Sequence, residues 1–409
     1  MTSSSALRTL LFTGKGGVGK TTAAAATATV TAARGLRTLV LSTDSAHSLA
    51  DAFGVSVGGE PTQLADRLHI QQVDAQERFE SAWSEVQGYL RSVLDSAGVD
   101  PIAAEELTVL PGAEEVLALL ELRSQARSGR WDVLVVDCAP TAETLRLLAL
   151  PEALGWYMER ILPAERRVVR LLRPMLTRAS GVPMPRDSVF DAVERLHADL
   201  AEVRTLLTDP GASVRLVLTP EAVVLAEARR TLTSLSLYGY RVDGVVANRI
   251  FPAEGADAWR QGWVDAQALV LREVEESFGS LRVRRSAYRP HEPRGLADLT
   301  AYAADLYGDA DPLEPSPGPP PVELRHAAGQ VQLRVALPLA ERADVDLRRA
   351  GDELVVTVGA HRRLLALPDS LRGARLAGAA MSDGALVVRF EPRSSVRAAE
   401  AKPGRAEVG

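Results

Sequence analysis

The segment Gly14–Thr22 places glycines around two lysines. It satisfies the pattern G-x-x-x-x-G-K-[ST], follows the apolar stretch Thr9–Thr13 and precedes an alanine-rich helix expected over Thr21–Arg34. Glycines let main-chain N–H groups turn inward around phosphate oxygens, and the helix N-terminus adds its positive end. We therefore expect a nucleoside triphosphate here, with Lys20 reaching its β- and γ-phosphates and the Thr21 hydroxyl holding Mg²⁺. The expected contacts are Gly14, Gly16, Gly17, Val18, Gly19, Lys20, Thr21 and Thr22.

Lysine usage sets the same segment apart. Lysine occurs only at positions 15, 20 and 402, and every other basic residue is arginine. The arginine bias fits a bias in coding composition and carries no function by itself. A compact ammonium is nonetheless kept twice in one loop, where the planar fork of arginine does not fit a tight phosphate cradle. We expect both Lys15 and Lys20 to lie near bound phosphate.

Two aspartates follow apolar strands. Asp137 ends the stretch Val133–Asp137, where a carboxylate can bind Mg²⁺ directly or through a water, and Asp44 comes just after Thr38–Ser42. The carboxyl ends of parallel strands lie at one edge of an open sheet, and ligands bind there. Asp44 is therefore a candidate for orienting the water that attacks the γ-phosphate. For Asp137 the alternative is a helix-capping role.

Asn248 follows a strand expected over Val242–Ala247 and could bond the edge of a base, with a capping or turn role as the alternative. GTPases read guanine with N-K-x-D, whose aspartate accepts hydrogen bonds from two guanine N–H groups. Here Phe251 takes the place of the aspartate, which would leave guanine's donors unpaired. ATP is therefore the expected nucleotide, with Asn248 and Pro290 as further expected contacts.

Short apolar runs alternate with longer helical patterns up to residue 308. Runs such as VLVVD are apolar on both faces, as strands of a parallel sheet covered by helices are. The alternation predicts an α/β fold over residues 1–308, with a mostly parallel sheet of the P-loop NTPase type. The expected strands are Thr9–Thr13, Thr38–Ser42, His69–Val73, Val133–Asp137, Val214–Leu218, Val242–Ala247 and Leu281–Arg284.

Two stretches break this alternation. Over Gln76–Gly98 and Val189–Leu207, apolar residues are spaced four and three apart, which predicts long amphipathic helices packed side by side. With Pro151–Arg178 they predict a helical insert outside the sheet, at about residues 76–130 and 151–210. The apolar stripes have two interpretations: a core between helices, or a groove for an apolar partner.

The composition changes at Asp309–Pro321, where a proline run predicts a stiff, extended linker. Residues 322–392 alternate apolar and polar side chains and predict a small antiparallel β-sandwich. Residues 393–409 are polar and are expected to be disordered. The strands expected in the sandwich are Val331–Ala336, Leu354–Val358 and Ala385–Phe390.

Bulk composition argues against several classes of protein. The net charge of −6 gives no electrostatic case for nucleic acid as a partner. No run approaches the ~18 apolar residues that span a bilayer, and the N-terminus lacks a secretory signal. We therefore expect a cytoplasmic protein without stable membrane insertion. The single cysteine, Cys138, allows neither an internal disulfide nor a Cys-x-x-Cys zinc site, so no zinc is expected.

Three segments are similar to motifs of one family. GKGGVGKTT, which has Lys15 in addition to Lys20, is a deviant Walker A motif. STDSAHSLADAF (Ser42–Phe53) and DCAPTAETLRLL (Asp137–Leu148) resemble the switch I and switch II segments of the arsenical-pump and guided-entry (ArsA/Get-type) ATPases. The resemblance covers about residues 7–307. The C-terminal piece, which ends in GALVVRFEP, resembles the α-crystallin-like domain appended to some members.

The resemblance implies a homodimer in which Lys15 reaches the partner's phosphates, Asp44 positions water and switch II reports the nucleotide state to the helical insert. The chain departs from the family pattern at three places. Ser45 replaces the usual proline and Ser48 a frequent asparagine, while Ala142-Glu143 stands where Gly-His is usual. The reduced backbone freedom of Ala142 puts the behaviour of switch II in doubt without removing Asp137.

Three kinds of function remain after this comparison. The first is an ATP-gated protein that binds a hydrophobic client, such as a tail-anchored membrane protein, with Trp156, Tyr157, Met158, Ile161 and Leu162 as the candidate surface. The second is an ATP-dependent regulatory or scaffold dimer whose C-terminal sandwich recruits partners. A membrane- or DNA-positioning ATPase is less well supported, because no amphipathic tail helix or basic stripe is present. Arsenite pumping is not expected, because arsenic needs several thiolates and the chain has one cysteine.

Overall fold

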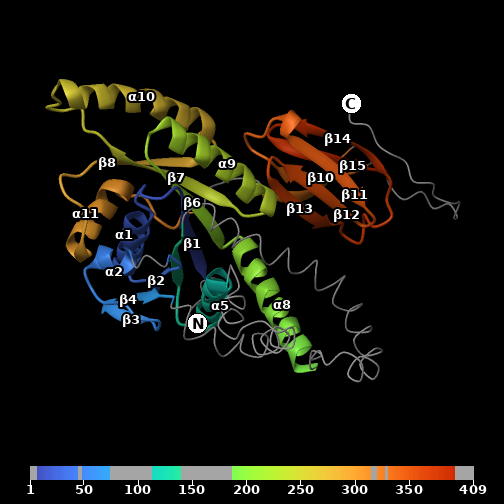
Figure 1. Ribbon diagram of the computed structural model, residues 1–409, viewed down its shortest axis with the longest axis horizontal. Coiled ribbons are helices and arrows are strands. Elements are labelled where there is room, and N and C mark those ends of the chain that lie inside the picture. Colours follow the sequence, from blue (N-terminus) through green and yellow to red (C-terminus); the bar gives the residue numbers. More distant parts are fainter. Residues whose placement is uncertain are drawn as a thin grey trace, which may run out of the picture.

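An eight-stranded sheet forms the centre of the first part of the chain in the computed structural model (Figure 1). The structure describes residues 7–44, 48–73, 113–139, 187–314, 320–327 and 330–391. The strand order is β3-β4-β2-β5-β1-β6-β7-β8, and every neighbouring pair is parallel except β3 and β4. The strands are β1 Arg8–Thr13, β2 Thr38–Ser42, β3 Thr62–Ala65, β4 Leu68–Gln72, β5 Val133–Asp137, β6 Ala212–Leu218, β7 Val242–Ile250 and β8 Arg282–Ala287. The predicted mostly parallel α/β sheet is confirmed, whereas the antiparallel edge strand β3 was not expected.

Helices cover the sheet on both faces (Figure 1). They are α1 Lys20–Ala33, α2 Ser48–Phe53, α5 Ala113–Arg127, α8 Asp187–Thr208, α9 Ala222–Tyr238, α10 Ala258–Phe278 and α11 Gly295–Tyr307. Helices α1 and α11 pack against each other, and α10 packs against α9. The sheet is therefore a middle layer, as continuous apolar strands require.

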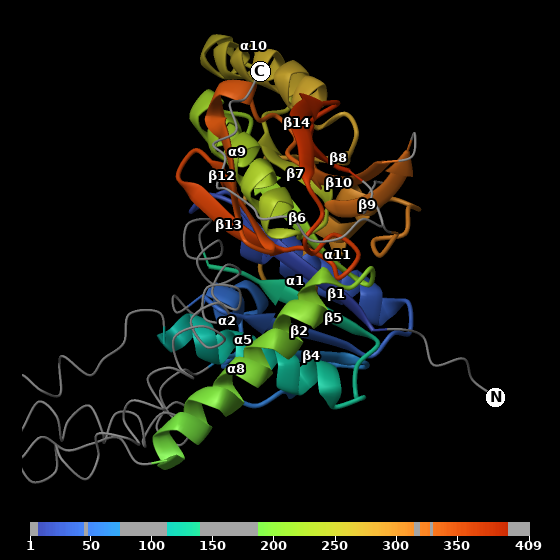
Figure 2. The same ribbon diagram turned by 90° about the vertical axis from the view of Figure 1, so that its right-hand side faces the viewer.

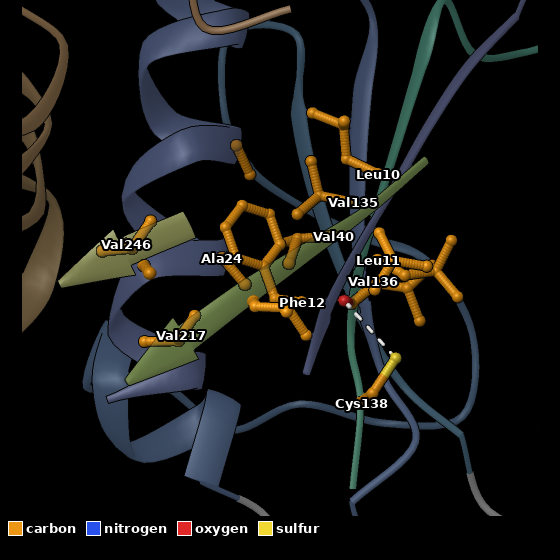
Figure 3. Close-up of a cluster of buried hydrophobic side chains, with 14 of the residues drawn as sticks. Leu10, Leu11, Phe12, Ala24, Val40, Val135, Val136, Cys138, Val217 and Val246 are labelled. Carbon is orange, nitrogen blue, oxygen red and sulfur yellow. Dashed lines mark hydrogen bonds between the residues drawn. The ribbon is translucent and has the colours of Figure 1, made fainter. Parts of the chain in front are cut away.

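The main core lies where the central strands meet α1 (Figure 3). Phe12, Leu10 and Val135 have no exposed surface, and they lie beside Ala24 of α1. Alanine also occupies other fully buried positions of α1, including Ala25. Small side chains let this helix lie close to the strands, so the loop that precedes it is held at the carboxyl edge of the sheet.

Two segments assigned to the helical insert fall within the described residues. Helix α8 confirms the helical spacing predicted over Val189–Leu207, and α5 packs against it. Leu122 of α5 and Leu200 and Val203 of α8 are buried in the main core, so these parts of the segments cover the sheet itself. The stretches Gln76–Gly98 and Pro151–Arg178 lie outside the described residues. No helix within the described ranges is both long and apolar enough to cross a bilayer.

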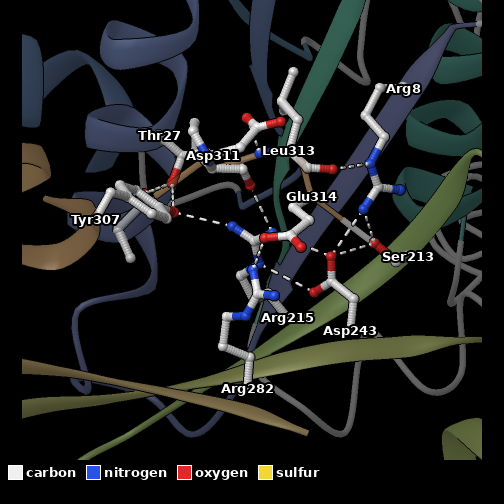
Figure 4. A network of polar contacts seen from close by, with 12 residues as sticks. Arg8, Thr27, Ser213, Arg215, Asp243, Arg282, Tyr307, Asp311, Leu313 and Glu314 are labelled. Atoms are coloured by element: carbon white, nitrogen blue, oxygen red, sulfur yellow. Dashed lines mark hydrogen bonds and ion pairs between the residues drawn. The ribbon is translucent and has the colours of Figure 1, made fainter. Parts of the chain in front are cut away.

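The segment after α11 does not leave the sheet at once (Figure 4). Arg215 donates a hydrogen bond of 2.8 Å to the carbonyl of Pro312, and Arg8 donates one of 3.2 Å to that of Leu313. Glu314 pairs with Arg282 at 2.5 Å. The expected linker over Asp309–Pro321 therefore begins with residues bound to the first domain, because Arg8, Arg215 and Arg282 of β1, β6 and β8 bind its carbonyls and the Glu314 carboxylate.

The C-terminal part is a small antiparallel sandwich, as predicted. One sheet has the order β14-β15-β10-β9 and the other β11-β12-β13, with a shared core that includes Val335, Val356 and Phe390. The elements are β9 Val322–Ala327, β10 Gln330–Ala336, a 3₁₀ turn Arg342–Asp344, β11 Val345–Ala350, β12 Glu353–Val358, β13 His361–Ala366, β14 Leu376–Ser382 and β15 Ala385–Phe390. Residues 392–409, which include the expected disordered tail, lie outside the described residues.

The sandwich packs against the C-terminal half of α9 (Figure 2). Leu237 of α9 is fully buried in the sandwich core. The Arg363 guanidinium, on β13, donates a hydrogen bond of 2.5 Å to the Leu237 carbonyl, and the Thr233 hydroxyl donates one of 2.5 Å to the Pro338 carbonyl. A cation near the last carbonyls of a helix is favourable, so α9 and the sandwich form one continuous contact.

Candidate functional site

The loop between β1 and α1 is shaped by two close backbone approaches. Gly14 has φ +154°, and a Cβ there would lie 2.1 Å from the Val217 carbonyl oxygen of β6. Gly19 has φ +92°, and a Cβ there would lie 2.3 Å from Nδ2 of Asn248. Any side chain at either position would push the loop away from the sheet edge. The predicted glycine-rich cradle is therefore seated between the ends of β6 and β7.

The two lysines of this loop differ in their surroundings. Lys20, the first residue of α1, is buried, and its Nζ lies 3.4 Å from the Lys15 carbonyl oxygen. Lys15 is half-buried, and its ammonium contacts no hydrogen-bond or ion-pair partner among the residues that the structure describes. Gly16 and Gly17 are exposed. Lys20 therefore faces the cradle from within, while Lys15 stands at its open side.

Asp137 lies at the centre of the carboxyl edge. Its strand is flanked by β1, where it pairs with Phe12, and by β2, where it pairs with Ser42. The Asp137 carbonyl accepts a hydrogen bond of 3.0 Å from the N–H of Thr43, and Cys138 N–H donates one of 3.1 Å to the Phe12 carbonyl. These bonds hold the start of the segment after β2 and that after β5 beside the glycine-rich loop.

The Asp137 carboxylate is fully buried, and neither oxygen accepts a hydrogen bond of ordinary geometry from the described residues. Burial raises its pKa to about 7; the Thr21 hydroxyl, the Lys20 ammonium and the Ser42 hydroxyl oppose this rise, and the charge of Asp44 adds to it. A buried carboxylate without a partner costs stability unless something binds it. Carboxylate and hydroxyl oxygens are the ligands that Mg²⁺ prefers, so the pair Thr21 and Asp137 fits that ion.

Asp44 lies at the same edge, two residues beyond β2. Its N–H donates to the Ser42 hydroxyl at 3.2 Å, and its carbonyl accepts a bond of 2.8 Å from the side-chain amide of Gln72. The side chain is half-buried and close enough to Asp137 to raise the pKa of that carboxyl. The main chain at Asp44 is thus fixed where the resemblance expects a water-positioning carboxylate. Residues 45–47 of the same segment lie outside the described ranges.

A cavity of about 250 Å³ opens beside the glycine-rich loop. It brings together both expected base contacts, Asn248 and Pro290, with Gly19 and Thr22 of the loop. Gly19 and Thr22 belong to both the phosphate loop and the cavity wall, so the two sites adjoin. A nucleotide that occupies a phosphate site and a base site at once requires this. The other lining residues are Arg249, Ala287, Tyr288, Arg289, His291, Glu292, Pro293 and Tyr302.

The sequence did not predict Tyr302 and Arg289, which line this cavity, or Gln267, which bonds the lining residue Arg249. Tyr302 of α11 contacts Asn248, and Arg289 places its guanidinium 5.5 Å from the centre of the Tyr302 ring. Gln267 of α10 accepts a bond of 2.8 Å from Phe251 N–H and donates one of 3.1 Å to the Arg249 carbonyl. It thereby holds Arg249, whose φ is +58°. No local pattern marks these side chains, because Tyr302 and Gln267 reach Asn248 and Arg249 from helices distant in sequence and Arg289 lies in the segment after β8.

Comparison with known proteins agrees with this geometry. A family model described as anion-transporting ATPase matches residues 7–308. The chain belongs to the ArsA ATPase family. A second model, described as an HSP20-like domain found in ArsA, matches residues 328–390, so the C-terminal sandwich is the α-crystallin-like domain that the sequence predicted. As a member of this family the protein is an ATPase and binds nucleotide.

Relatives of the ArsA-family chain match it along most of its length. A protein of Prosthecochloris vibrioformis with the provisional name arsenical pump-driving ATPase is 38% identical over 94% of this chain and 96% of its own. A protein of Aquifex aeolicus with a similar provisional name is 34% identical over 90% of this chain and 95% of its own. A protein of Streptomyces coelicolor whose name assigns no activity is 42% identical over 94% and 98%. The two-domain arrangement is therefore shared.

Sulfur and metal chemistry are limited in the part of this ArsA-family chain that the structure describes. Cys138, the residue after Asp137, is buried, with its Sγ 3.9 Å from the Val136 carbonyl oxygen (Figure 3). Over the described ranges no three His, Cys, Asp or Glu side chains gather as a metal site would need. The oxygen pair Thr21 and Asp137 is thus the candidate for a cation that arrives with the nucleotide.

Proposed function

We propose that MgATP closes a homodimer of this ArsA-family ATPase in the cytoplasm, and that closure controls the binding of a hydrophobic client segment. The observation that carries the proposal is the open side of the phosphate loop. Gly16 and Gly17 are exposed there, and the Lys15 ammonium has no partner among the described residues. A second copy facing this side would receive Lys15 on its phosphates, as the family resemblance implies. Closure would then depend on bound ATP.

Within this proposal the hydrolytic roles follow from position. Lys20 and the loop amides bind the phosphates, and Asp44 orients the attacking water. Thr21 and Asp137 hold Mg²⁺, with Asp137 in contact directly or through a water. The bound ion would neutralise part of the phosphate charge. Asn248 and Pro290 contact the adenine ring in the adjoining cavity. The loss of phosphate would release Asp137, and with it the end of β5.

The dimer is tested by light scattering after size exclusion, with and without a non-hydrolysable ATP analogue. We expect a shift from monomer to dimer mass, or tightening of an existing dimer, only with the analogue and Mg²⁺. Mixed dimers test Lys15 itself. A Lys15→Met chain should regain turnover when paired with an Asp44→Asn chain that retains Lys15. If mixed dimers form but turnover is not restored, Lys15 does not act on the phosphates of the partner.

The client role rests on the residues Trp156, Tyr157, Met158, Ile161 and Leu162, which lie outside the described residues. It is tested by cross-linking in MgATP to an apolar helical peptide of the kind that anchors a membrane protein by its C-terminus. We expect cross-links to residues 151–178 in MgATP and few in ADP. Equal cross-linking in MgATP and in ADP would show that the nucleotide does not control client binding.

Arsenite is not part of this proposal. The relatives' provisional names refer to an arsenical pump. Binding of arsenic as a cargo calls for several thiolates, whereas this chain has the single buried Cys138. Turnover should therefore be insensitive to added arsenite. An activation by arsenite that persists in a Cys138→Ser variant would show a site of another chemistry.

A scaffold role is the second candidate, favoured by the edge strands of the sandwich. Strands β9 and β14 are the outer strands of their sheet, and edge strands can pair with another chain. Deletion of Val322–Gly409 separates the two functions. Client capture that is unchanged, together with lost assembly, would place the sandwich in a scaffold role; lost client capture would place it in the gated mechanism.

A further inference from the structure

The Asn248 side chain is held from two sides at the mouth of the base cavity. Its Nδ2 donates a hydrogen bond of 2.8 Å to the Val18 carbonyl of the phosphate loop, and its Oδ1 accepts one of 3.0 Å from the Tyr302 hydroxyl. We propose that Tyr302 is a positioning residue that fixes the Asn248 amide in the orientation that selects adenine over guanine. The inference rests on the proposed contact between Asn248 and the base, and it adds the residue that sets specificity.

The orientation of the amide follows from its partners. A carbonyl oxygen can only accept, so the group of Asn248 that faces Val18 must be the NH₂. The oxygen then faces Tyr302, whose hydroxyl must donate. The approach to Val18 is close because position 19 is glycine: a Cβ there would lie 2.3 Å from Nδ2. The Val18 carbonyl thus sets one of the two amide orientations, and the Tyr302 hydroxyl holds the amide oxygen in that orientation.

The Asn248 amide keeps one donor and one acceptor that are free to bond a base. Two of its four hydrogen-bonding capacities are used, which leaves one N–H and one Oδ1 lone pair. Asn248 is 4% exposed and lines the cavity. Adenine presents an acceptor at N7 and a donor at N6, which this pair matches, whereas guanine presents acceptors at both N7 and O6. In guanine, O6 would face the Oδ1 that Tyr302 holds in place, so the fixed amide rejects it.

Tyr302 is suited to act only as a neutral donor. Its side chain is 2% exposed, and burial raises the pKa of its hydroxyl to about 12. The ring is covered by the Arg289 guanidinium, and α11 packs along α1, the helix of the phosphate loop. The hydroxyl is therefore protonated at neutral pH, and its position is tied to the loop that it helps to orient.

The test removes the hydroxyl and keeps the ring, as Tyr302→Phe. KM and kcat are measured for ATP, for GTP and for 7-deaza-ATP, which lacks the N7 acceptor. In the wild type we expect ATP to be preferred over both analogues. In Tyr302→Phe the preference for ATP over GTP in kcat/KM should fall at least about fivefold, through KM rather than kcat, because the base is remote from the reacting phosphate.

Tyr307→Phe is the matched control. Tyr307 lies on the same helix and is similarly buried, but its hydroxyl bonds Thr27 of α1 and Arg215 of β6. This variant should lose stability and keep the ATP:GTP ratio. A Tyr302→Phe ratio equal to that of Tyr307→Phe would overturn the inference.

Asn248→Ala distinguishes the contact between Asn248 and the base from the positioning role of Tyr302. If Tyr302 acts through Asn248, its substitution should change the nucleotide preference no further once Asn248 is alanine. Additive effects of the two substitutions would overturn the positioning role. An Asn248→Ala variant with an unchanged ATP:GTP ratio would instead overturn the proposed base contact. The affinities of the isolated chain for ATP and GTP are measured beside turnover, and this ratio of affinities does not depend on a dimer or a client.

Discussion

Arg215 and Asp243 form a fully buried ion pair between β6 and β7, with Nε of the arginine 3.0 Å from Oδ1 of the aspartate (Figure 4). Asp243 is the second residue of β7, whereas Arg215 lies in the middle of β6, two residues before Val217, which the phosphate loop approaches. The Tyr307 hydroxyl joins Arg215 to Thr27 of α1, with 2.6 Å between the two hydroxyl oxygens. The helix of the phosphate loop is thereby fixed near its middle as well as at its start.

The first prediction concerns this pair. Asp243→Asn leaves the Arg215 guanidinium buried without its counter-charge, so the free energy of unfolding should fall by about 3–5 kcal/mol. Urea unfolding at neutral pH measures this loss. Glu275→Gln is the control, because its partner Arg285 is half exposed and such pairs contribute about 0–1 kcal/mol. Equal losses in the two variants would contradict the assignment.

The same aspartate predicts a pH dependence. Burial alone would raise the pKa of Asp243, but Arg215, Arg8 and Ser213 hold it below its ordinary value of 3.8. The unfolded chain therefore takes up the proton first as the pH falls, and the contribution of the pair to stability is lost below that value. Unfolding measured between pH 5 and 3 should show a steeper loss in the wild type than in Asp243→Asn, and parallel curves would contradict this.

A second buried aspartate should respond in the opposite direction. Asp137 has no hydrogen bond of ordinary geometry within the described residues, so Asp137→Asn removes a buried charge rather than a partner. In the absence of nucleotide and Mg²⁺ the variant should be more stable by about 1–3 kcal/mol, while its hydrolysis is abolished. Thermal unfolding and phosphate release measure the two effects. A loss of stability would mean that a group outside the described residues already bonds the carboxylate.

Lys20→Ala should abolish productive nucleotide binding. The buried ammonium lies inside the loop, and its removal leaves the phosphate charge without its nearest counter-charge. A loss of about 100-fold or more in MgATP affinity is expected from calorimetric titration. Lys20→Arg should also fail, because the planar fork does not fit between the Lys15 carbonyl and the loop. Arg34→Ala, at the exposed end of the same helix, is the control that should bind normally.

Asp44→Asn should separate binding from chemistry. The amide keeps the size of the side chain and the hydrogen bonds of the Asp44 main chain, but it cannot orient water as a carboxylate does. We expect MgATP affinity within about threefold of the wild type and a kcat lower by about 100-fold or more. Asp51→Asn, on the exposed face of α2, should leave both unchanged. If kcat is unaltered in Asp44→Asn, a group other than Asp44 orients the attacking water.

The parts of the site that sequence reasoning found are those whose signal is local. The glycine spacing around Lys20 and the apolar strand before Asp137 each combine composition, length and position in one short segment. Burial on both faces then fixes the parallel sheet, and the register brings the ends of β1, β2 and β5 together. The sequence therefore suffices to place the glycine-rich loop and Asp137 at one edge of the sheet, while their contacts with phosphate and Mg²⁺ stay predictions.

The base cavity depends on contacts that no short segment encodes. Tyr302 meets Asn248 across 54 positions of sequence, because α11 returns along α1. Strand β3 has no buried run, since Thr62 and Gln63 are exposed, and it therefore resembles a loop. The linker is similar: prolines after Asp309 indicate an extended chain, but the arginines that bind Pro312 and Leu313 come from distant strands.

The contact between the two domains supplies the last prediction. Arg363 is buried and donates to the Leu237 carbonyl in the last turn of α9, whereas its neighbour Arg362 on the same strand is exposed. Arg363→Ala would leave that carbonyl buried without this donor, at a cost of about 1–3 kcal/mol. Arg362→Ala is the matched control and should cost less than about 0.5 kcal/mol. Urea unfolding followed by tryptophan fluorescence, in parallel with proteolysis at the proline-rich segment, measures both variants. We expect only Arg363→Ala to unfold at a lower urea concentration and to be cleaved faster between the domains, because α9 then no longer holds the sandwich. If the two variants behaved alike, the domains would be joined by the linker and not by this contact.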